Sequence, residues 1–128
     1  MKQKCVLIVD DSSVMRKIVE RSLRQAGFEL GQVLEANNGL EGLNLAQKHT
    51  LDLILSDINM PTMDGLEFVR QVQTIKSAKG VGVPVVIIST EGSEAKVVEA
   101  IHCGARGFIR KPFTADQVRE RIAPFLQE

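Results

Sequence analysis

The chain has 128 residues, of which 44% are hydrophobic and 25% charged, and these proportions are typical of one globular domain and exclude a disordered chain. Equal numbers of acidic and basic side chains give a formal net charge of zero, which offers no electrostatic reason to expect nucleic-acid binding. No apolar run approaches the ~20 residues of a membrane span. Cys5 and Cys103 lack a redox or metal-binding spacing, so we expect two buried free thiols in a cytoplasmic protein.

Short apolar runs alternate with segments of helical period along the whole chain. Two of these runs are almost continuously apolar and rich in Val and Ile, which is typical of strands covered on both faces in a parallel sheet. The predicted strands, in chain order, are Cys5–Val9, Val33–Leu34, Leu51–Leu55, Val83–Ile88 and Phe108–Ile109.

A helical period follows each of the five runs. The first helix is predicted from Met15 to Ala26, with Ser12 or Ser13 as its N-cap and Gly27 as its stop. The later helices are predicted around residues 40–46, 66–72, 97–101 and 118–126, with start signals at Asp64, Ser93 and the capping box Thr114–Gln117.

This βαβαβαβαβα order predicts a doubly wound α/β fold with one five-stranded parallel sheet. We expect a single domain over residues 1–128, with no output domain, because no linker-like or low-complexity segment divides the chain.

Polar side chains follow the predicted strands where ligands bind in open α/β sheets, at the carboxyl ends. Asp10 and Asp11 follow the first strand, Asp57 the third, Ser89 ends the fourth, and Lys111 follows the fifth. A lone Asp at a strand end is more often a cap or turn residue, but three carboxylates on one edge repel unless some are protonated or a cation holds them. Ligands that are all oxygens favour Mg²⁺.

Taken together, several short motifs resemble the signature set of response-regulator receiver domains, over essentially the whole chain. The motifs are Val9-Asp10-Asp11, Ser56-Asp57-Ile58-Asn59-Met60-Pro61, Met63-Asp64-Gly65, Ile88-Ser89-Thr90 and Lys111-Pro112-Phe113. This resemblance, and not the periodicity, implies a flavodoxin-like (βα)5 fold with strand order 2-1-3-4-5. It also implies a two-component signalling protein similar to the stand-alone chemotaxis regulators.

The resemblance implies a role for each residue at the acidic edge. Asp57 would accept a phosphoryl group from a phosphohistidine on a sensor histidine kinase. Asp11, Asp57 and the main-chain carbonyl of Asn59 would bind Mg²⁺ (or Mn²⁺), and Asp10 would act through a bound water. Lys111 would pair with Asp57 before transfer and with a phosphoryl oxygen afterwards.

The same resemblance implies a switch. Ser89 would bond to the phosphoryl group, Phe108 would move into the space that this vacates, and the surface of the fourth helix, fifth strand and fifth helix would change for a partner to read. Asn59 and Glu91 stand at the two positions that tune loss of phosphate. The Lys111–Pro112 bond resembles the cis peptide of the family.

Three candidate functions, two of receiver type and one enzyme, follow from these residues. The first is a monomeric receiver whose partners are a kinase and a downstream target such as a flagellar switch component, with a phosphatase as a further candidate. The alternative is a phosphorelay shuttle that passes phosphate to a histidine phosphotransfer protein. A phosphohydrolase with an Asp nucleophile ranks last, because the acid it needs two residues after the nucleophile is replaced by Asn59. We therefore expect no enzyme activity beyond self-phosphorylation and autodephosphorylation.

Overall fold

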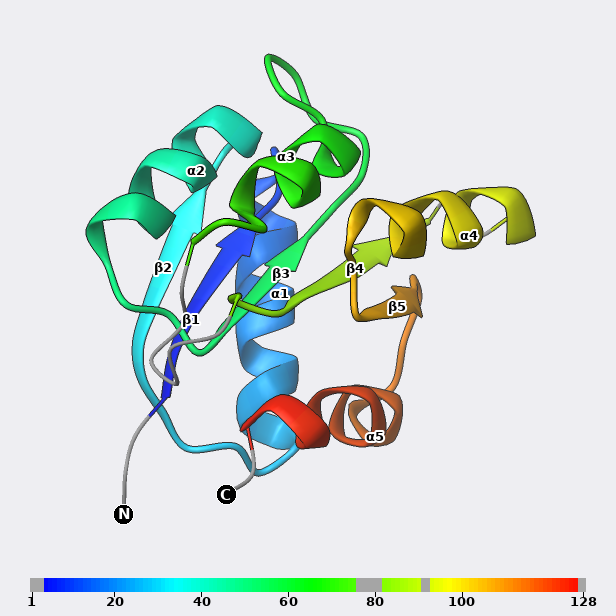
Figure 1. Cartoon of the computed structure of the whole chain (residues 1–128). Coiled ribbons are helices and arrows are strands. Elements are labelled where there is room, and N and C mark those ends of the chain that lie inside the picture. Colours follow the sequence, from blue (N-terminus) through cyan, green and yellow to red (C-terminus); the bar gives the residue numbers. More distant parts are fainter. Residues whose placement is uncertain (1–3, 76–81, 91–92, 127–128) are drawn as a thin grey trace.

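The computed structural model describes residues 4–75, 82–90 and 93–126, which alternate strand and helix from one end to the other (Figure 1). In chain order the elements are β1 (Lys4–Val9), α1 (Ser13–Gln25), β2 (Leu30–Ala36), α2 (Gly39–Lys48), β3 (Leu53–Ser56), α3 (Gly65–Val72), β4 (Val85–Ser89), α4 (Glu94–Cys103), β5 (Gly107–Arg110) and α5 (Ala115–Leu126).

The strands form one parallel sheet in the order β2-β1-β3-β4-β5. The predicted α/β class and strand order are therefore confirmed. The register pairs Val9 with Ser56 and Ser89 with Arg110, so the carboxyl ends of the strands finish at one edge. The residues that follow those ends are brought together there.

Each face of the sheet has its own core. Figure 1 shows α1 and α5 on one face and α2, α3 and α4 on the other. Because side chains alternate along a strand, Val6 and Ile8 pack toward α1 and α5, whereas Leu7 and Val9 pack toward α2 and α3. This double coverage is the physical reason for the uninterrupted apolar runs in β1 and β4.

Side-chain caps begin the helices, as predicted for Ser12, Asp64 and Ser93. Ser12, Asn38, Asp64 and Ser93 each accept a hydrogen bond from the backbone amide three residues later. The capping box before α5 is confirmed in both directions, with the Thr114 hydroxyl accepting from the Gln117 amide and the Gln117 side chain accepting from the Thr114 amide.

Several predicted strand boundaries are wrong. β2 is seven residues long and not two, because it lies at the sheet edge, where polar residues such as Gln32 are exposed and interrupt the apolar pattern. Conversely, Leu51 and Val83 are buried but precede β3 and β4. Hydrophobicity reports burial, and burial extends into loops that cover the core.

The cysteines are free, as expected, but both are only partly buried. Burial raises the pKa of the Cys5 thiol, and the nearby Asp52 carboxylate raises it further.

Among the residues that the structure describes, no helix combines the length and the hydrophobicity required to cross a lipid bilayer.

Candidate phosphoryl-acceptor site

Three carboxylates meet at the carboxyl edge of the sheet. Asp10, Asp11 and Asp57 each offer an oxygen within 4.8 Å of the others. Asp10 is buried, Asp57 half-buried and Asp11 exposed, so the cluster opens to solvent on one side. Main-chain hydrogen bonds continue the strand ladders into the site, with the Asp10 amide donating to Ala36 and the Asp57 amide to Val9. The sheet itself therefore fixes where these side chains begin.

Lys111 joins this cluster from the far end of the chain. Its Nζ donates to Asp10 Oδ2 at 3.1 Å and to Asp57 Oδ2 at 3.3 Å. All three side chains are at most 15% exposed, so little water screens these contacts. The Lys111 amide also donates to the Ser89 carbonyl at 3.0 Å, and the Lys111–Pro112 peptide is cis, as the resemblance implied.

The donor set fits a hard dication. The cluster holds three carboxylates against one ammonium and therefore keeps a surplus of negative charge, and each ligand that it offers is an oxygen. Such a set suits Mg²⁺, which takes carboxylates and water.

The loop after β3 positions Asp57 through close backbone packing. Asp57 Oδ1 accepts from the Ile58 amide at 2.7 Å, and the Gly65 amide donates to the Ile58 carbonyl at 2.7 Å. A Cβ on Gly65 would collide with the Asp57 carbonyl oxygen, so this position requires glycine. The loop also holds Thr62 at a φ of 69°, which is unusual for a β-branched residue.

The remaining predicted residues lie around the acidic cluster rather than in it. Ser89 is fully buried at the end of β4, and Asn59 is exposed two residues after Asp57. Phe108 is 7% exposed and packs in the core on the α3–α4 side. Glu91 lies outside the described residues.

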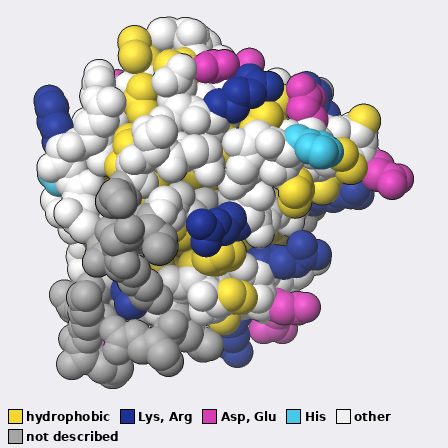
Figure 2. Space-filling model, viewed as in Figure 1, with side chains coloured by type: hydrophobic (Ala, Val, Ile, Leu, Met, Phe, Trp, Pro, Cys, Tyr) yellow, Lys and Arg dark blue, Asp and Glu magenta, His cyan; other side chains and the backbone are white. Residues whose placement is uncertain are grey.

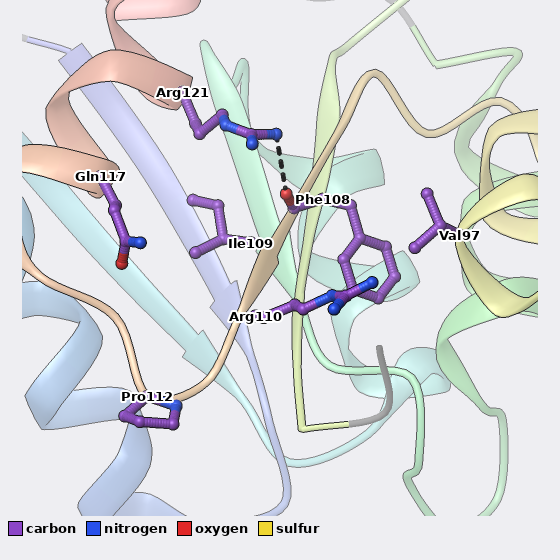
Figure 3. Close-up of a pocket in the computed structure, with 7 residues that line it drawn as sticks. All are labelled: Val97, Phe108, Ile109, Arg110, Pro112, Gln117 and Arg121. Carbon is purple, nitrogen blue, oxygen red and sulfur yellow. Dashed lines mark hydrogen bonds between the residues drawn. The ribbon is translucent and has the colours of Figure 1, made fainter. Parts of the chain in front are cut away.

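A groove lies along β5 between α4 and α5. Its cavity volume is about 430 Å³. In Figure 3 the Phe108 ring points toward Val97 of α4, while Arg121 of α5 donates to the Phe108 carbonyl oxygen at 3.3 Å. The groove is lined by Val97, Phe108, Ile109, Arg110, Pro112, Gln117 and Arg121. Its walls thus combine apolar side chains with two guanidinium groups.

Sequence reasoning missed one side chain at the site, Arg16. Its Nη1 donates to the Asp10 carbonyl oxygen at 2.6 Å. The available signal was weak, since a basic residue one turn into an amphipathic helix is ordinarily solvated.

The match to known proteins covers this entire arrangement. The family model described as the response regulator receiver domain matches residues 6–123. The chain belongs to the response-regulator receiver family. A chemotaxis protein CheY homolog of Campylobacter jejuni is 38% identical over 122 residues, which are 94% of this chain and 91% of that protein.

Two solved structures show the same receiver fold. The chemotaxis protein CheY4 of Vibrio cholerae matches with a TM-score of 0.82 at 38% identity, covering 98% of this chain and 100% of that one. The CheX–CheY–BeF3–Mg²⁺ complex of Borrelia burgdorferi matches with a TM-score of 0.83 at 28% identity, covering 98% and 90%. As a receiver, the chain is a two-component response regulator, and its similarity is to chemotaxis proteins.

Proposed function

We propose that this response regulator accepts a phosphoryl group on Asp57 from a sensor histidine kinase and signals through the α4–β5–α5 surface in a chemotaxis-type pathway. The observation that carries the proposal is the double contact of Lys111 with Asp10 and Asp57. It places a cation beside the acceptor carboxylate, where charge must be neutralised during phosphoryl transfer.

In the transfer step, an oxygen of Asp57 bonds to phosphorus as the phosphorus–nitrogen bond of the donor phosphohistidine breaks. The imidazole keeps the bonding electron pair, and an acyl phosphate forms on Asp57. Lys111, at 3.3 Å from Asp57 Oδ2, then pairs with a phosphoryl oxygen. The Ile58 amide, bonded to Asp57 Oδ1, keeps the carboxylate in one orientation throughout.

Asp11, Asp57 and the main-chain carbonyl of Asn59 would hold Mg²⁺ or Mn²⁺, with Asp10 acting through a water. When bound, the ion supplies positive charge to the phosphoryl oxygens. The clustering of Asp10, Asp11 and Asp57 within 4.8 Å supports this assignment, as does the Mg²⁺ in the Borrelia burgdorferi complex.

The signal would reach the groove through Ser89 and Phe108. Ser89 is joined to Lys111 by a main-chain hydrogen bond, and Phe108 lies on the neighbouring strand, opposite Ile87. Because a phenylalanine has no hydroxyl to bond outside the core, burial favours its inward position. The switch would therefore act mainly through the Ser89 loop and the seating of α4 against Phe108.

The downstream partner would read a groove lined by apolar side chains together with Arg110 and Arg121, which fits a protein segment that carries both apolar and acidic residues. On the face of the molecule that Figure 2 shows, acidic and basic side chains are interspersed. Asn59 stands where a phosphohydrolase would carry its general acid, and an amide cannot donate a proton as an acid. We therefore propose that the protein signals and catalyses no reaction beyond its own phosphorylation and dephosphorylation.

The test is phosphorylation by acetyl phosphate with Mg²⁺, measured by intact-protein mass spectrometry. We expect one phosphoryl adduct on the native protein and none on Asp57→Asn. Asp64→Asn is the matched control, since Asp64 caps α3 through its Oδ1 and an asparagine caps equally well. An adduct that persists in Asp57→Asn would refute the assignment of the acceptor.

A further inference from the structure

Arg16 is a partly buried cation that the roles above leave unused. Its amide donates to the carbonyl of the N-cap Ser12 in the first turn of α1, and its side chain is 12% exposed. The guanidinium makes three contacts, to Asp10 O at 2.6 Å, Asn37 Oδ1 at 2.9 Å and Glu35 Oε1 at 2.8 Å. An Arg fork with three acceptors is held in one orientation.

The contact between Arg16 and the Asp10 carbonyl oxygen restricts the orientation of the peptide that joins Asp10 to Asp11. The carbonyl oxygen of Asp10 belongs to the planar peptide that also contains the amide and Cα of Asp11. The Asp10 amide already donates to Ala36, and its Oδ1 accepts from the Ser12 amide at 2.9 Å. With the carbonyl held as well, rotation of the Asp10–Asp11 peptide plane would break the contact with Arg16, so the direction in which the exposed Asp11 side chain leaves the backbone is restricted.

Glu35 makes this contact compatible with a nearby dication. Its carboxylate binds Arg16 through Oε1 and Lys17 through Oε2, each at 2.8 Å. Glu35 therefore offsets part of the guanidinium charge, through an atom (Nε) other than the one that contacts Asp10. Hydrogen bonds from Lys17 and Arg16 lower the pKa of Glu35, so the carboxylate remains charged at neutral pH.

We propose that Arg16 is a positioning residue for the acceptor site, which orients the Asp10–Asp11 peptide and thereby strengthens divalent-cation binding by Asp11. This inference rests on the proposed function, because it assumes that the acidic cluster binds Mg²⁺. Residues that do not touch the metal but orient its ligands through hydrogen bonds typically contribute tenfold or more to metal affinity.

The two possible roles of Arg16, as a positioning residue or merely as a nearby positive charge, predict opposite changes in Mg²⁺ affinity when its side chain is removed. If Arg16 acted only as a nearby cation, its removal would relieve repulsion and tighten Mg²⁺ binding. If it positions Asp11, its removal weakens binding. Lys17 supplies the matched control, since its Nζ donates to the same Glu35 carboxylate but its side chain is 65% exposed.

The experiment is calorimetric titration of the full chain with MgCl₂, since the sequence has no tryptophan to report binding by fluorescence. For Arg16→Ala we expect an affinity lower by about tenfold, and for Lys17→Ala little change. Arg16→Lys, which preserves the charge but offers one nitrogen for three acceptors, should lose an intermediate amount. Thermal unfolding of each variant, measured without Mg²⁺, separates metal affinity from loss of fold.

Affinity in Arg16→Ala that equals or exceeds the native value would overturn the inference, as would equal losses in Arg16→Ala and Lys17→Ala. If Arg16→Ala does not fold, Arg16→Lys decides, and native affinity in that variant would count against positioning. If the native protein gives neither heat of binding nor a change in amide chemical shifts on addition of MgCl₂, both this inference and the magnesium site of the proposed function are overturned.

Discussion

The two helices α3 and α4 lie side by side on one face of the sheet but are attached to it very differently. Five of the eight residues of α3 are buried, whereas Ala100 is the one buried residue among the ten of α4. Val98 and Ile101 of α4 are about half exposed. The free energy that opposes displacement scales with the apolar contacts that are lost. Displacing α3, which follows the loop that carries Asp57, would therefore cost more free energy than displacing α4, which lies beside the groove.

This difference suits a protein that must hold its chemistry rigidly and change its surface readily. Phosphoryl transfer requires carboxylates and a cation at fixed separations, and α3 begins where the loop carrying Asp57 ends. A signalling surface needs two arrangements that differ by a few kcal/mol. Lys111 connects the two regions, since its side chain contacts Asp57 and its amide bonds to Ser89 at the end of β4.

The largest expected effect follows from removing Lys111, the residue that contacts both Asp57 and Ser89. Lys111→Ala removes the side chain that bridges Asp10 and Asp57, so we expect the response of α4 to be lost. Phosphorylation of Asp57 should persist, but more slowly, because the carboxylate remains while one neutralising charge is gone. Intact-protein mass spectrometry after treatment with acetyl phosphate and Mg²⁺ measures the phosphorylation, and amide chemical shifts recorded on addition of beryllofluoride and Mg²⁺ measure the response of α4. Full shifts of α4 amides in this variant would show that the signal bypasses Lys111.

Core substitutions test the contrast between the helices directly. Phe68 of α3 is fully buried, and Phe68→Ala should lower the free energy of unfolding by about 3–5 kcal/mol through lost burial and the cavity left behind. Ile101→Ala on α4 removes a side chain that is 51% exposed and should cost less than about 1 kcal/mol. Urea denaturation measures the two losses, and similar values would contradict the proposed difference in attachment.

A smaller effect, of the opposite sign, is expected in the loop that leads into α3. Thr62 is exposed and has a φ of 69°, a conformation that asparagine adopts with less strain than a β-branched residue. Thr62→Asn should therefore raise the free energy of unfolding by about 1 kcal/mol. Thr50→Asn is the control, because Thr50 is also exposed but is not among the positive-φ residues of the described chain. A lower free energy of unfolding in Thr62→Asn would refute the hypothesis that the positive φ strains Thr62.

The smallest expected effect concerns the ion pairs of Glu35, which is 26% exposed. Lys17 and then Arg16 lower the pKa of Glu35 below its ordinary value of 4.5. A carboxylate with a lowered pKa stabilises the fold above that ordinary value, and the contribution disappears as the pH falls through the pKa of the folded state. At neutral pH Glu35→Gln should cost about 0.5 kcal/mol, a modest value because part of the side chain is screened by water.

Urea denaturation of the native protein and Glu35→Gln at a series of pH values checks this. The difference between the two proteins should shrink as the solution is made acidic. A difference that stays constant down to the acidic end of the series would assign the loss to packing and not to charge.

Much of the proposed acceptor site followed from local patterns. Four of the five predicted apolar runs are followed within two residues by a residue of the proposed site, so Asp10, Asp11 and Asp57 could be assigned to one edge once the strands were taken as parallel. Glu91, by contrast, lies outside the described residues, and its role stays a prediction. The two-residue prediction for β2 failed because an edge strand exposes polar residues that an apolar pattern does not include.

Sequence alone determined the order of elements, their caps and the sheet edge that carries the acids, because hydrophobic period and N-cap chemistry act over a few neighbouring residues. The tertiary structure decided which charges meet. Lys111 contacts Asp10 across 101 positions and Asp57 across 54, and Arg16 reaches the Asp10 carbonyl because α1 packs back on β1. Such contacts depend on side-chain torsions that packing selects, and no local pattern encodes them.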